Sequence, residues 1–289
     1  MSVTPVAKPA PVPGAYRIFA TLCVAAGILL TATAGVLAAP KADLWQRWAA
    51  HDPDSTARIA HGDWTRLLSA YARPSTDGVT RFAYGDVTAT DRGILEKYIA
   101  RLEATPITTF NRREQFAYWA NFYNALTIKV ILDHYPVASI RDIDISPGFF
   151  ADGPWGAKLA TVEGEKISLD DIEHRILRPI WKDPRIHYVV NCASIGCPDL
   201  PPVALTPENT ETLLNELAER FVNHPRGVSV LDGRIVVSSI YSWFEADFGG
   251  TEAGVLDHVR RFASSALAGR LKGRSSYDDH AYNWKLNGL

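Results

Sequence analysis

The segment between Asn111 and Pro136 constrains the fold more than any other part of the sequence. Asn111 is a good helix N-cap, Glu114 three residues later fits a capping box, and Pro136 ends the helix. Apolar and aromatic residues lie all round the helix between them, so it must be buried on most faces. These residues are Phe116, Tyr118, Trp119, Phe122, Tyr123, Leu126, Ile128, Val130 and Ile131.

Two amides lie within this apolar helix. Asn121 and Asn124 fall three residues apart on a shared face, and a buried amide needs hydrogen-bond partners. They either staple the core together, or they line a cleft and orient a catalytic group. Both interpretations stay open, and we keep both residues as candidate substrate-binding groups.

The other elements are helices and short strands joined mainly by hairpins. Asp232-Gly233 is a strong two-residue hairpin signal, and Gly164 marks a second turn. We therefore predict an α+β fold, a helix-rich single domain with a small, mainly antiparallel sheet. Helices are expected over 41–55, 91–105, 168–181, 207–223, 242–248 and 251–267, the hairpins over 158–167 and 227–239, and further strands over 186–190 and 282–286.

The N-terminal residues have the pattern of a targeting segment. Lys8 and Arg17 precede an uncharged apolar run over 18–37, and small residues before Ala39 offer a cleavage site. A run of roughly 20 apolar residues is also long enough to anchor the chain in a membrane. We predict a signal peptide or membrane anchor over 1–39 and an extracytoplasmic globular domain over 40–289, either periplasmic or secreted.

Charge argues against a nucleic-acid partner. Removing Lys8 and Arg17 from 30 basic residues leaves 28 against 32 acids, a net charge of −4. Nucleic-acid binding needs clustered positive charge. The sequence also lacks a phosphate-binding glycine loop, a Gly-x-Ser-x-Gly elbow and a His-Glu-x-x-His pair, so no cofactor or metal is predicted.

The expected helix over 168–181 carries an acid on its apolar side. Glu173 has the spacing of Leu169 and Ile176, so it must be paired or its pKa rises. Partners near in sequence are Arg178, Arg185 and His187. Asp170, His174 and Arg178 follow at intervals of four, which usually means a surface charge ladder.

Residues 185–198 (RIHYVVNCASIGCP) concentrate the reactive groups of the chain. Cys23 lies in the leader, so only Cys192 and Cys197 belong to the expected domain. Cysteines in an oxidising compartment often pair, and the turn at Gly196 lets these two approach. A bridge closing so small a loop contributes about 2 kcal/mol, so it would mainly rigidify the loop.

A second interpretation is a nucleophilic thiol assisted by histidine. Strand alternation over 186–191 would place His187 and Cys192 on opposite faces, whereas Cys197 could fold back towards His187. Asn191 or Asn121 would orient the imidazole, as in papain-type sites, with Glu173 as the rival.

Two weaker alternatives use the same thiols. Zinc could be held by Cys192, Cys197, His187 and His174, although four residues between the cysteines is wide for a zinc site. A redox-active pair is the other alternative. Its spacing differs from that of thioredoxin-like motifs, and no helix follows closely to stabilise a thiolate.

Three segments resemble one known family. Residues 114–124 (EQFAYWANFYN), 167–178 (ISLDDIEHRILR) and 183–198 (DPRIHYVVNCASIGCP) are similar to the family catalogued as domain of unknown function 547 (DUF547), and the tail 282–287 (YNWKLN) looks like its ending. The resemblance covers about residues 95–287. It implies no activity, but members linked to a glutaredoxin-like domain or a leucine-zipper segment imply thiol chemistry or protein interaction.

The sequence favours a thiol- and histidine-dependent enzyme of hydrolase or transferase type acting on a small or peptide-like substrate. The alternatives are a binding or scaffold module with a structural disulfide, a thiol–disulfide redox protein and a metal-binding domain. Candidate catalytic residues are Cys197, His187, Asn191, Glu173 and Cys192, and candidate substrate-binding residues are Asn121, Asn124, Arg178 and Arg185.

Overall fold

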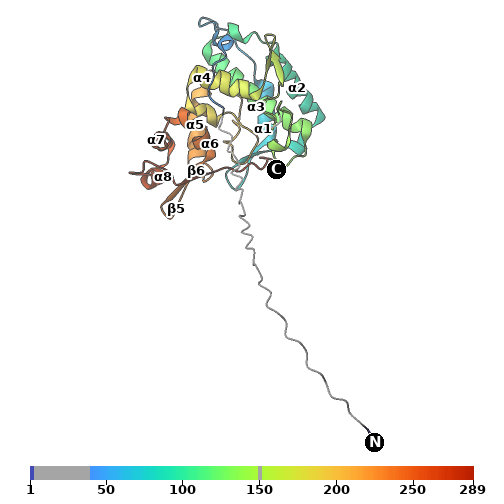
Figure 1. Ribbon diagram of the computed structural model, residues 1–289. Coiled ribbons are helices and arrows are strands. Elements are labelled where there is room, and N and C mark those ends of the chain that lie inside the picture. The colour runs from blue at the N-terminus through green and yellow to red at the C-terminus, as the bar shows by residue number, and fades with distance from the viewer. Residues whose placement is uncertain (3–39, 149–151) are drawn as a thin grey trace, which may run out of the picture. The chain divides into compact units, whose positions relative to one another are not determined.

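The computed structural model describes residues 1–2, 40–148 and 152–289, and its folded unit spans Ala38–Leu289 (Figure 1). The predicted leader therefore lies, apart from its first two residues, outside the described part. Within the described residues, every helix is too short or too polar to span a bilayer.

The folded unit is α+β, as predicted, with more helix than strand. Its strands form three small sheets instead of one. The helices are α1 (Gly62–Tyr71), α2 (Ala89–Glu103), α3 (Arg112–His134), α4 (Arg178–Trp181), α5 (Thr210–Val222), α6 (Ser239–Trp243), α7 (Glu252–Phe262) and α8 (Ser265–Arg270). The strands are β1 (Ala72–Pro74), β2 (Thr80–Phe82), β3 (Ala160–Val162), β4 (Glu165–Ile167), β5 (Val228–Leu231), β6 (Arg234–Ser238) and β7 (Asp279–Ala281).

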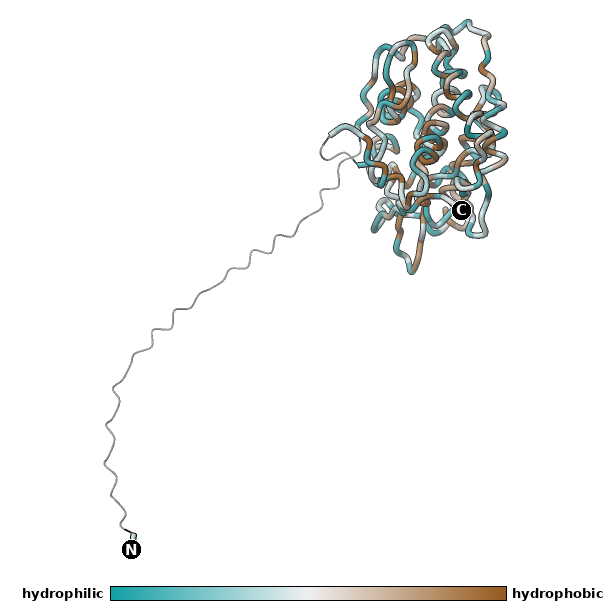
Figure 2. Tube along the Cα trace, turned by 90° about the vertical axis from the view of Figure 1, so that its right-hand side faces the viewer, coloured by the Kyte–Doolittle hydropathy of each residue, from teal (hydrophilic) through white to brown (hydrophobic). Residues whose placement is uncertain are grey.

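Helix α3 occupies the centre of the core, as its all-round apolar sequence predicts. It packs against α2 and against the π-helix η5 (Asp171–Leu177) that leads into α4. Asn111 caps it by accepting hydrogen bonds from the backbone N–H groups of Arg113 and Glu114. The expected capping box is wrong in one respect, because the Glu114 carboxylate accepts from the backbone of Ile59 instead. Figure 2 shows that hydrophobic segments of the chain run through the middle of the folded unit.

Both predicted hairpins are confirmed. β3 and β4 pair antiparallel across Glu163-Gly164, and β5 and β6 pair across Asp232-Gly233. Asp232 (φ 51°) and Gly233 (φ 78°) both lie in the left-handed region, as a type I′ turn requires. The tail strand is misplaced in the prediction, since β7 covers Asp279–Ala281 and pairs parallel to β6.

Three other expectations differ from the structure. Residues 186–190 are not a strand, because Pro184–Tyr188 form the 3₁₀ helix η6. The helix expected over 41–55 shrinks to η1 (Gln46–Ala49). Helix α1 and the β1–β2 hairpin were not predicted, although Trp64, Leu67, Leu68 and Tyr71 of α1 have the helical spacing i, i+3, i+4, i+7.

The helices expected over 242–248 and 251–267 are each split. α6 is followed by the 3₁₀ helix η7 (Glu245–Phe248), and α7 by α8. After the break between α6 and η7, Asp247 of η7 contacts His187. The remaining 3₁₀ helices are η2 (Tyr84–Asp86), η3 (Ile107–Thr109) and η4 (Ile140–Asp142).

Candidate functional site

The reactive side chains fall into two groups. The first, here called the charged cluster, consists of Glu173, His174, Arg178, His187 and Asp247. The second, here called the thiol loop, is residues 191–198. Hydrogen bonds outweigh burial and lower the pKa of Cys192 overall, but the negative charge of Glu173 opposes this lowering, so the two groups lie within electrostatic range of each other.

The charged cluster is assembled by four short elements. Ser168 and Asp171 begin the first of them with a reciprocal cap: the Ser168 hydroxyl accepts from the Asp171 N–H (3.1 Å), and the Asp171 carboxylate accepts from the Ser168 N–H (2.9 Å). The chain then runs as the π-helix η5, a rare form that is frequent at functional sites. It presents Glu173 and His174, while α4, η6 and η7 supply Arg178, His187 and Asp247.

His187 lies between two carboxylates. Its Nε2 is 2.8 Å from Oδ2 of Asp247, and its Nδ1 is 3.5 Å from Oε1 of Glu173. The ring stacks on Phe244 with 4.3 Å between centroids. Only 2% of the side chain is exposed, so the imidazole is sealed from solvent. Such a pair of acids favours the doubly protonated ring, which can donate to both.

Opposing effects set the charge states of the cluster. Burial alone lowers the pKa of His187, but the hydrogen bonds to Asp247 and Glu173 outweigh it and the pKa is raised. Burial raises the pKa of Glu173, yet His174, which is protonated at the low pH where this acid titrates, acts with His187 and Arg178 to bring it down to about 2. Burial likewise opposes ionisation of Asp247, whose pKa His187 and Arg178 hold well below its usual range. At neutral pH both acids are therefore charged.

Arg178 completes the cluster. Its Nε donates to Asp247 (2.6 Å), its Nη1 donates to the Pro40 carbonyl (2.7 Å), and its guanidinium lies 4.7 Å from the Phe244 ring centre. Nη1 also donates to Nδ1 of His174 (3.0 Å), so that ring is neutral. Burial agrees, because it lowers the pKa of His174 to about 4.

Two sequence interpretations are corrected here. His174 and Arg178 are both 6% exposed, so the expected surface charge ladder is wrong and these residues are internal. Arg185 does not join Glu173; it binds Asp183 (2.6 Å) and Glu211 (3.0 Å) at the surface. Of the three partners that the sequence offered for Glu173, His187 is the one that contacts its carboxylate.

The thiol loop brings its two sulfurs together. Sγ of Cys192 and Sγ of Cys197 are 2.6 Å apart, closer than two non-bonded sulfurs approach, so the loop holds the pair in position to form a Cys192–Cys197 bond. The backbone N–H of Cys192 donates to Sγ of Cys197 (2.9 Å). Ala193 has φ 58°, a left-handed conformation that costs a non-glycine residue about 1–2 kcal/mol. Strain of this kind is concentrated at functional sites.

The two thiols have different environments. Cys197 is 3% exposed, whereas Cys192 is half-buried. Burial raises the pKa of Cys192, but hydrogen bonds from Cys197, Ser194 and Tyr282 reverse this and lower it. Burial and the adjacent Cys192 raise the pKa of Cys197 far above its usual value. Cys192 is therefore the thiol that ionises first and that reagents can reach.

Buried amides fix the loop. Asn124 donates to the Val189 carbonyl (2.7 Å) and accepts from the Asn191 N–H (2.8 Å), so α3 holds the loop at its start. Asn191 donates to the Pro198 carbonyl (2.6 Å) and accepts from the Ala193 N–H (2.8 Å), which closes the loop on itself.

Asn121 has the same kind of role elsewhere, because it bonds both backbone groups of Leu205 (2.8 and 2.9 Å). These contacts favour the core-stapling interpretation of Asn121 and Asn124.

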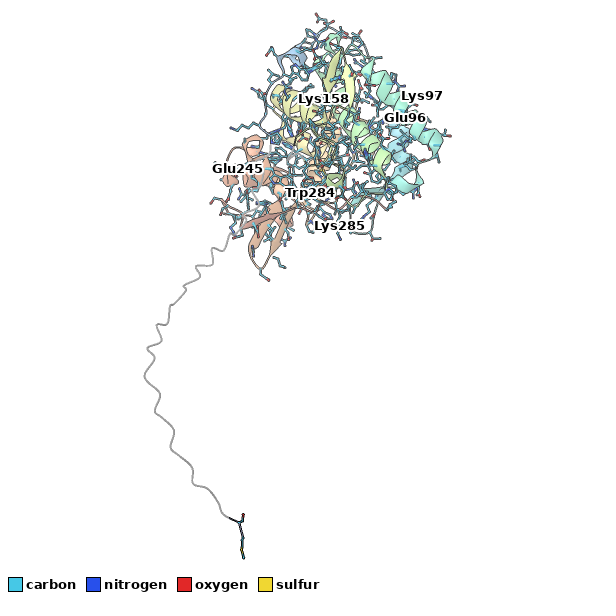
Figure 3. All side chains as sticks on the ribbon, turned by 45° about the vertical axis from the view of Figure 1, so that its right-hand side comes forward. Glu96, Lys97, Lys158, Glu245, Trp284 and Lys285 are labelled. Carbon is cyan, nitrogen blue, oxygen red and sulfur yellow. The ribbon has the colours of Figure 1, made fainter. Side chains whose placement is uncertain are left out.

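The C-terminal tail (residues 282–289) covers the thiol loop. The Tyr282 hydroxyl lies 2.9 Å from Sγ of Cys192 and 2.8 Å from Oγ of Ser194. The N–H of Gly196 donates to the Asn283 carbonyl (2.8 Å), and a Cβ at Gly196 would lie only 2.8 Å from the Asn283 nitrogen. Glycine is thus required where the tail crosses. Figure 3 labels Trp284 and Lys285 along this tail.

The expected pairing of Cys197 with His187 is not what the structure contains. Among the hydrogen bonds of the described residues, none joins the imidazole to either thiol, and His187 uses both nitrogens on carboxylates. The zinc hypothesis fails on the same geometry. Across residues 40–148 and 152–289, no three His, Cys, Asp or Glu side chains are grouped so as to hold a metal ion.

Two members of these groups, Asp247 and Ser194, and two residues that contact them, Phe244 and Tyr282, were not predicted. Asp247 and Phe244 come from a segment that reads as ordinary core edge, and Ser194 and Tyr282 carry hydroxyls without a motif. The sequence holds one signal for them: Asp247 follows the aromatic pair Trp243-Phe244 by three residues. Their role depends on contacts across the fold, up to 90 residues apart in the case of Cys192 and Tyr282.

Comparison with known proteins gives a family without an assigned activity. The model of the family described as "Protein of unknown function, DUF547" matches residues 107–222, which confirms the resemblance of the three motifs within them; the tail motif 282–287 lies outside the match. The matched segment includes both cysteines, His187 and Glu173, whereas Asp247 and Tyr282 lie beyond it. No curated protein and no solved structure matches the chain.

Proposed function

We propose that this chain, whose residues 107–222 belong to the DUF547 family, is an exported thiol-dependent enzyme in which Cys192 is the attacking thiolate and Cys197 the resolving thiol. The reaction class is thiol–disulfide exchange with a disulfide-containing substrate. One observation carries the proposal: two thiols lie 2.6 Å apart, the more accessible with a lowered pKa and the buried one with a raised pKa.

The chemistry follows from these properties. The Cys192 thiolate attacks one sulfur of the substrate disulfide, forming a mixed disulfide and expelling the other sulfur as a thiolate. Cys197 then attacks Sγ of Cys192, the Cys192–Cys197 bond forms, and the second substrate sulfur leaves with the proton of Cys197. Two electrons pass from the cysteine pair to the substrate, and the same steps in reverse oxidise a dithiol.

The surroundings support each step. Hydrogen bonds from Cys197, Ser194 and Tyr282 stabilise the Cys192 thiolate, so attack does not need a histidine base. The sulfurs are already near the bonding distance of about 2.05 Å, so resolution requires little movement. The charged cluster beside the loop has a positioning role, since η6 and its His187 precede the thiol loop directly.

The proposal includes export. The apolar run over 18–37 and the small residues before Ala39 support an extracytoplasmic location, with the chain either released by cleavage or tethered by that run. Disulfide substrates are abundant in such compartments.

A disulfide reagent with a coloured leaving group tests the mechanism. The reduced full chain, carrying Cys23→Ser in the reference protein (called wild type below) and in every variant so that only Cys192 and Cys197 can react, is mixed with one equivalent of 5,5′-dithiobis(2-nitrobenzoate). The wild type should release two thiolates per chain and retain none, because Cys197 resolves the mixed disulfide. Cys197→Ala should release one and retain one. Cys192→Ala should react slowly, because Cys197 is 3% exposed.

Two results would overturn the proposal. One is rapid reaction of Cys192→Ala, which would make Cys197 the accessible thiol. The other is a wild type that retains the reagent as a stable mixed disulfide, which would show that the pair does not resolve.

A non-catalytic module with a structural Cys192–Cys197 disulfide is the second candidate. The observation that favours it is the network of amides and tail contacts around the loop, which also serves a rigid fold. Mass spectrometry of the isolated full chain after alkylation, with and without dithiothreitol, separates the two candidates. A bridge that resists millimolar dithiothreitol in the folded chain supports the structural role, whereas ready reduction supports exchange.

A further inference from the structure

A hollow of about 300 Å³ opens at the start of α3, and it shares no residue with the charged cluster or the thiol loop. A second hollow of about 420 Å³ meets it, and the two have Arg112, Arg113 and Pro207 in common. The first is lined by Arg112, Arg113, Phe116, Trp181, Asp183, Pro207, Thr210, Glu211 and Leu214. All of these lie inside the family-matched segment 107–222.

Arg112 and Arg113 line both hollows, and their positive charges have no acidic partner among the described residues. No described carboxylate forms an ion pair with either residue. Both lie in the first turn of α3, where the helix dipole disfavours positive charge. Burial lowers the pKa of Arg112, a further sign that its charge is not compensated.

Both guanidinium groups donate hydrogen bonds to the protein, but each keeps N–H groups that have no acceptor among the described residues. Arg112 donates from Nη1 to the Trp48 carbonyl (3.3 Å) and to Gln115 (2.6 Å), and from Nη2 to the Ala49 carbonyl. Three of its five N–H groups are thus used, and Nε and one hydrogen of Nη2 have no acceptor among the described residues. Arg113 donates from Nη2 to the Pro207 carbonyl alone. Donors therefore remain for an anion on both side chains.

The opposite wall is aromatic. Phe116 and Trp181 meet edge to face with ring centroids 5.4 Å apart, and the Arg112 guanidinium lies 5.7 Å from the Trp181 ring centre. Leu214 adds an aliphatic surface. A flat apolar group of a ligand would be desolvated here.

The acids at the rim do not neutralise these arginines. Asp183 and Glu211 also line the hollow, but Arg185 binds both, at 2.6 and 3.0 Å. The field at Arg112 and Arg113 therefore stays positive. The sequence marked Arg185 as a candidate substrate-binding residue. In the structure it forms ion pairs with the two acids at the rim of the hollow.

We propose that this hollow binds a small organic anion. Its carboxylate or phosphate contacts Arg112 and Arg113, and its flat apolar body packs on Phe116 and Trp181. The site is separate from the thiol pair, so the inference goes beyond the proposed function and stands or falls independently of it.

Isothermal titration of the full chain tests the site with four probes: benzoate, phenyl phosphate, inorganic phosphate and benzyl alcohol. Benzoate and phenyl phosphate should bind in the millimolar range, as expected for so small a ligand. Inorganic phosphate should bind more weakly than phenyl phosphate, because it lacks the apolar body. Benzyl alcohol, which lacks the charge, should bind at least tenfold more weakly than benzoate. If benzoate binds more tightly than phenyl phosphate the site prefers a carboxylate, and if phenyl phosphate binds more tightly it prefers a phosphate.

Arg113→Gln should weaken benzoate binding about tenfold, the loss expected for one charge-assisted hydrogen bond. Arg270→Gln is the matched control, because Arg270 is also exposed, also donates to one backbone carbonyl (Val230, 3.0 Å), and lines neither hollow. Trp181→Leu should weaken the aryl anions but leave inorganic phosphate unchanged.

Three results would overturn the site. They are absence of benzoate binding, equal binding by Arg113→Gln and wild type, and equal binding of benzyl alcohol and benzoate. Because Arg113 is exposed, its substitution leaves the fold intact, and a circular dichroism spectrum checks this.

Discussion

Replacing Glu173 by Gln should remove a large electrostatic contribution without changing the shape of the side chain. The carboxylate contacts His187 at 3.5 Å and has a pKa of about 2, against about 4.5 in the unfolded chain. A lowering by about 2.5 units corresponds to about 3 kcal/mol of stability at pH 7. We therefore expect Glu173→Gln to lower the free energy of unfolding by about 3 kcal/mol at that pH.

The pH dependence has a defined sign. The folded-state pKa is below the unfolded one, so the stabilisation is fully present above about pH 5 and is lost as the pH falls towards 2. The difference between wild type and Glu173→Gln should therefore shrink to less than half its pH 7 value at pH 3, where the unfolded carboxyl is protonated and the folded one still ionised.

Urea unfolding followed by circular dichroism at pH 7, 5, 4 and 3 measures this difference in the reduced chain. Glu165→Gln is the control, because Glu165 is 42% exposed and lies 4.0 Å from Arg47. A surface pair of that kind contributes about 0.5 kcal/mol or less. If Glu173→Gln were as stable as wild type at pH 7, or if the difference stayed constant down to pH 3, the account of the charged cluster would be wrong.

Three further predictions concern the thiol loop. Asn124→Ala leaves two buried backbone groups without partners and should cost about 2–4 kcal/mol in urea unfolding; a loss below about 1 kcal/mol would contradict the stapling role. Gly196→Ala places a methyl group 2.8 Å from the Asn283 nitrogen, so it should displace the tail and speed alkylation of Cys192; unchanged alkylation would show that the tail does not shield the thiol. Tyr282→Phe removes a hydrogen bond that lowers the pKa of Cys192, so the midpoint of its alkylation should move to higher pH, and an unmoved midpoint would exclude that bond.

The sequence predicts those parts of the fold that depend on local pattern. α3 follows from its cap, its apolar surface and Pro136, and the β5–β6 turn follows from Asp232-Gly233. Each signal lies within a few residues of the element that it specifies. The α+β class follows because these local signals together predict several helices and short strands linked by hairpins.

The segment after Pro184 shows where local pattern fails. An apolar stretch from Ile186 to Val190 is compatible with a strand or with a short buried helix, and periodicity does not separate the two. Tertiary contacts favour the 3₁₀ helix, since His187 reaches two carboxylates and Asn124 binds the backbone at its end. The alternation argument that turned Cys197 towards His187 failed with that strand.

The candidate site was predicted only in part, because local sequence indicates some of its residues and tertiary contacts bring in the others. The thiols, Glu173 and His187 lie close together in sequence, so a dense segment revealed them. Asp247 and Tyr282 come from later elements whose approach depends on the break between α6 and η7 and on the course of the tail. Nothing in their local sequence indicates a partner.

The central claim is that Cys192 ionises more readily than a free cysteine because Cys197 donates to it. The rate of Cys192 alkylation by iodoacetamide, followed by mass spectrometry from pH 5 to 10 in the reduced chain, measures this directly. We predict a midpoint below the value of about 8.5 for a free thiol, and a higher midpoint in Cys197→Ala. A wild-type midpoint at or above that of a free thiol, or one that Cys197→Ala leaves in place, would contradict the account.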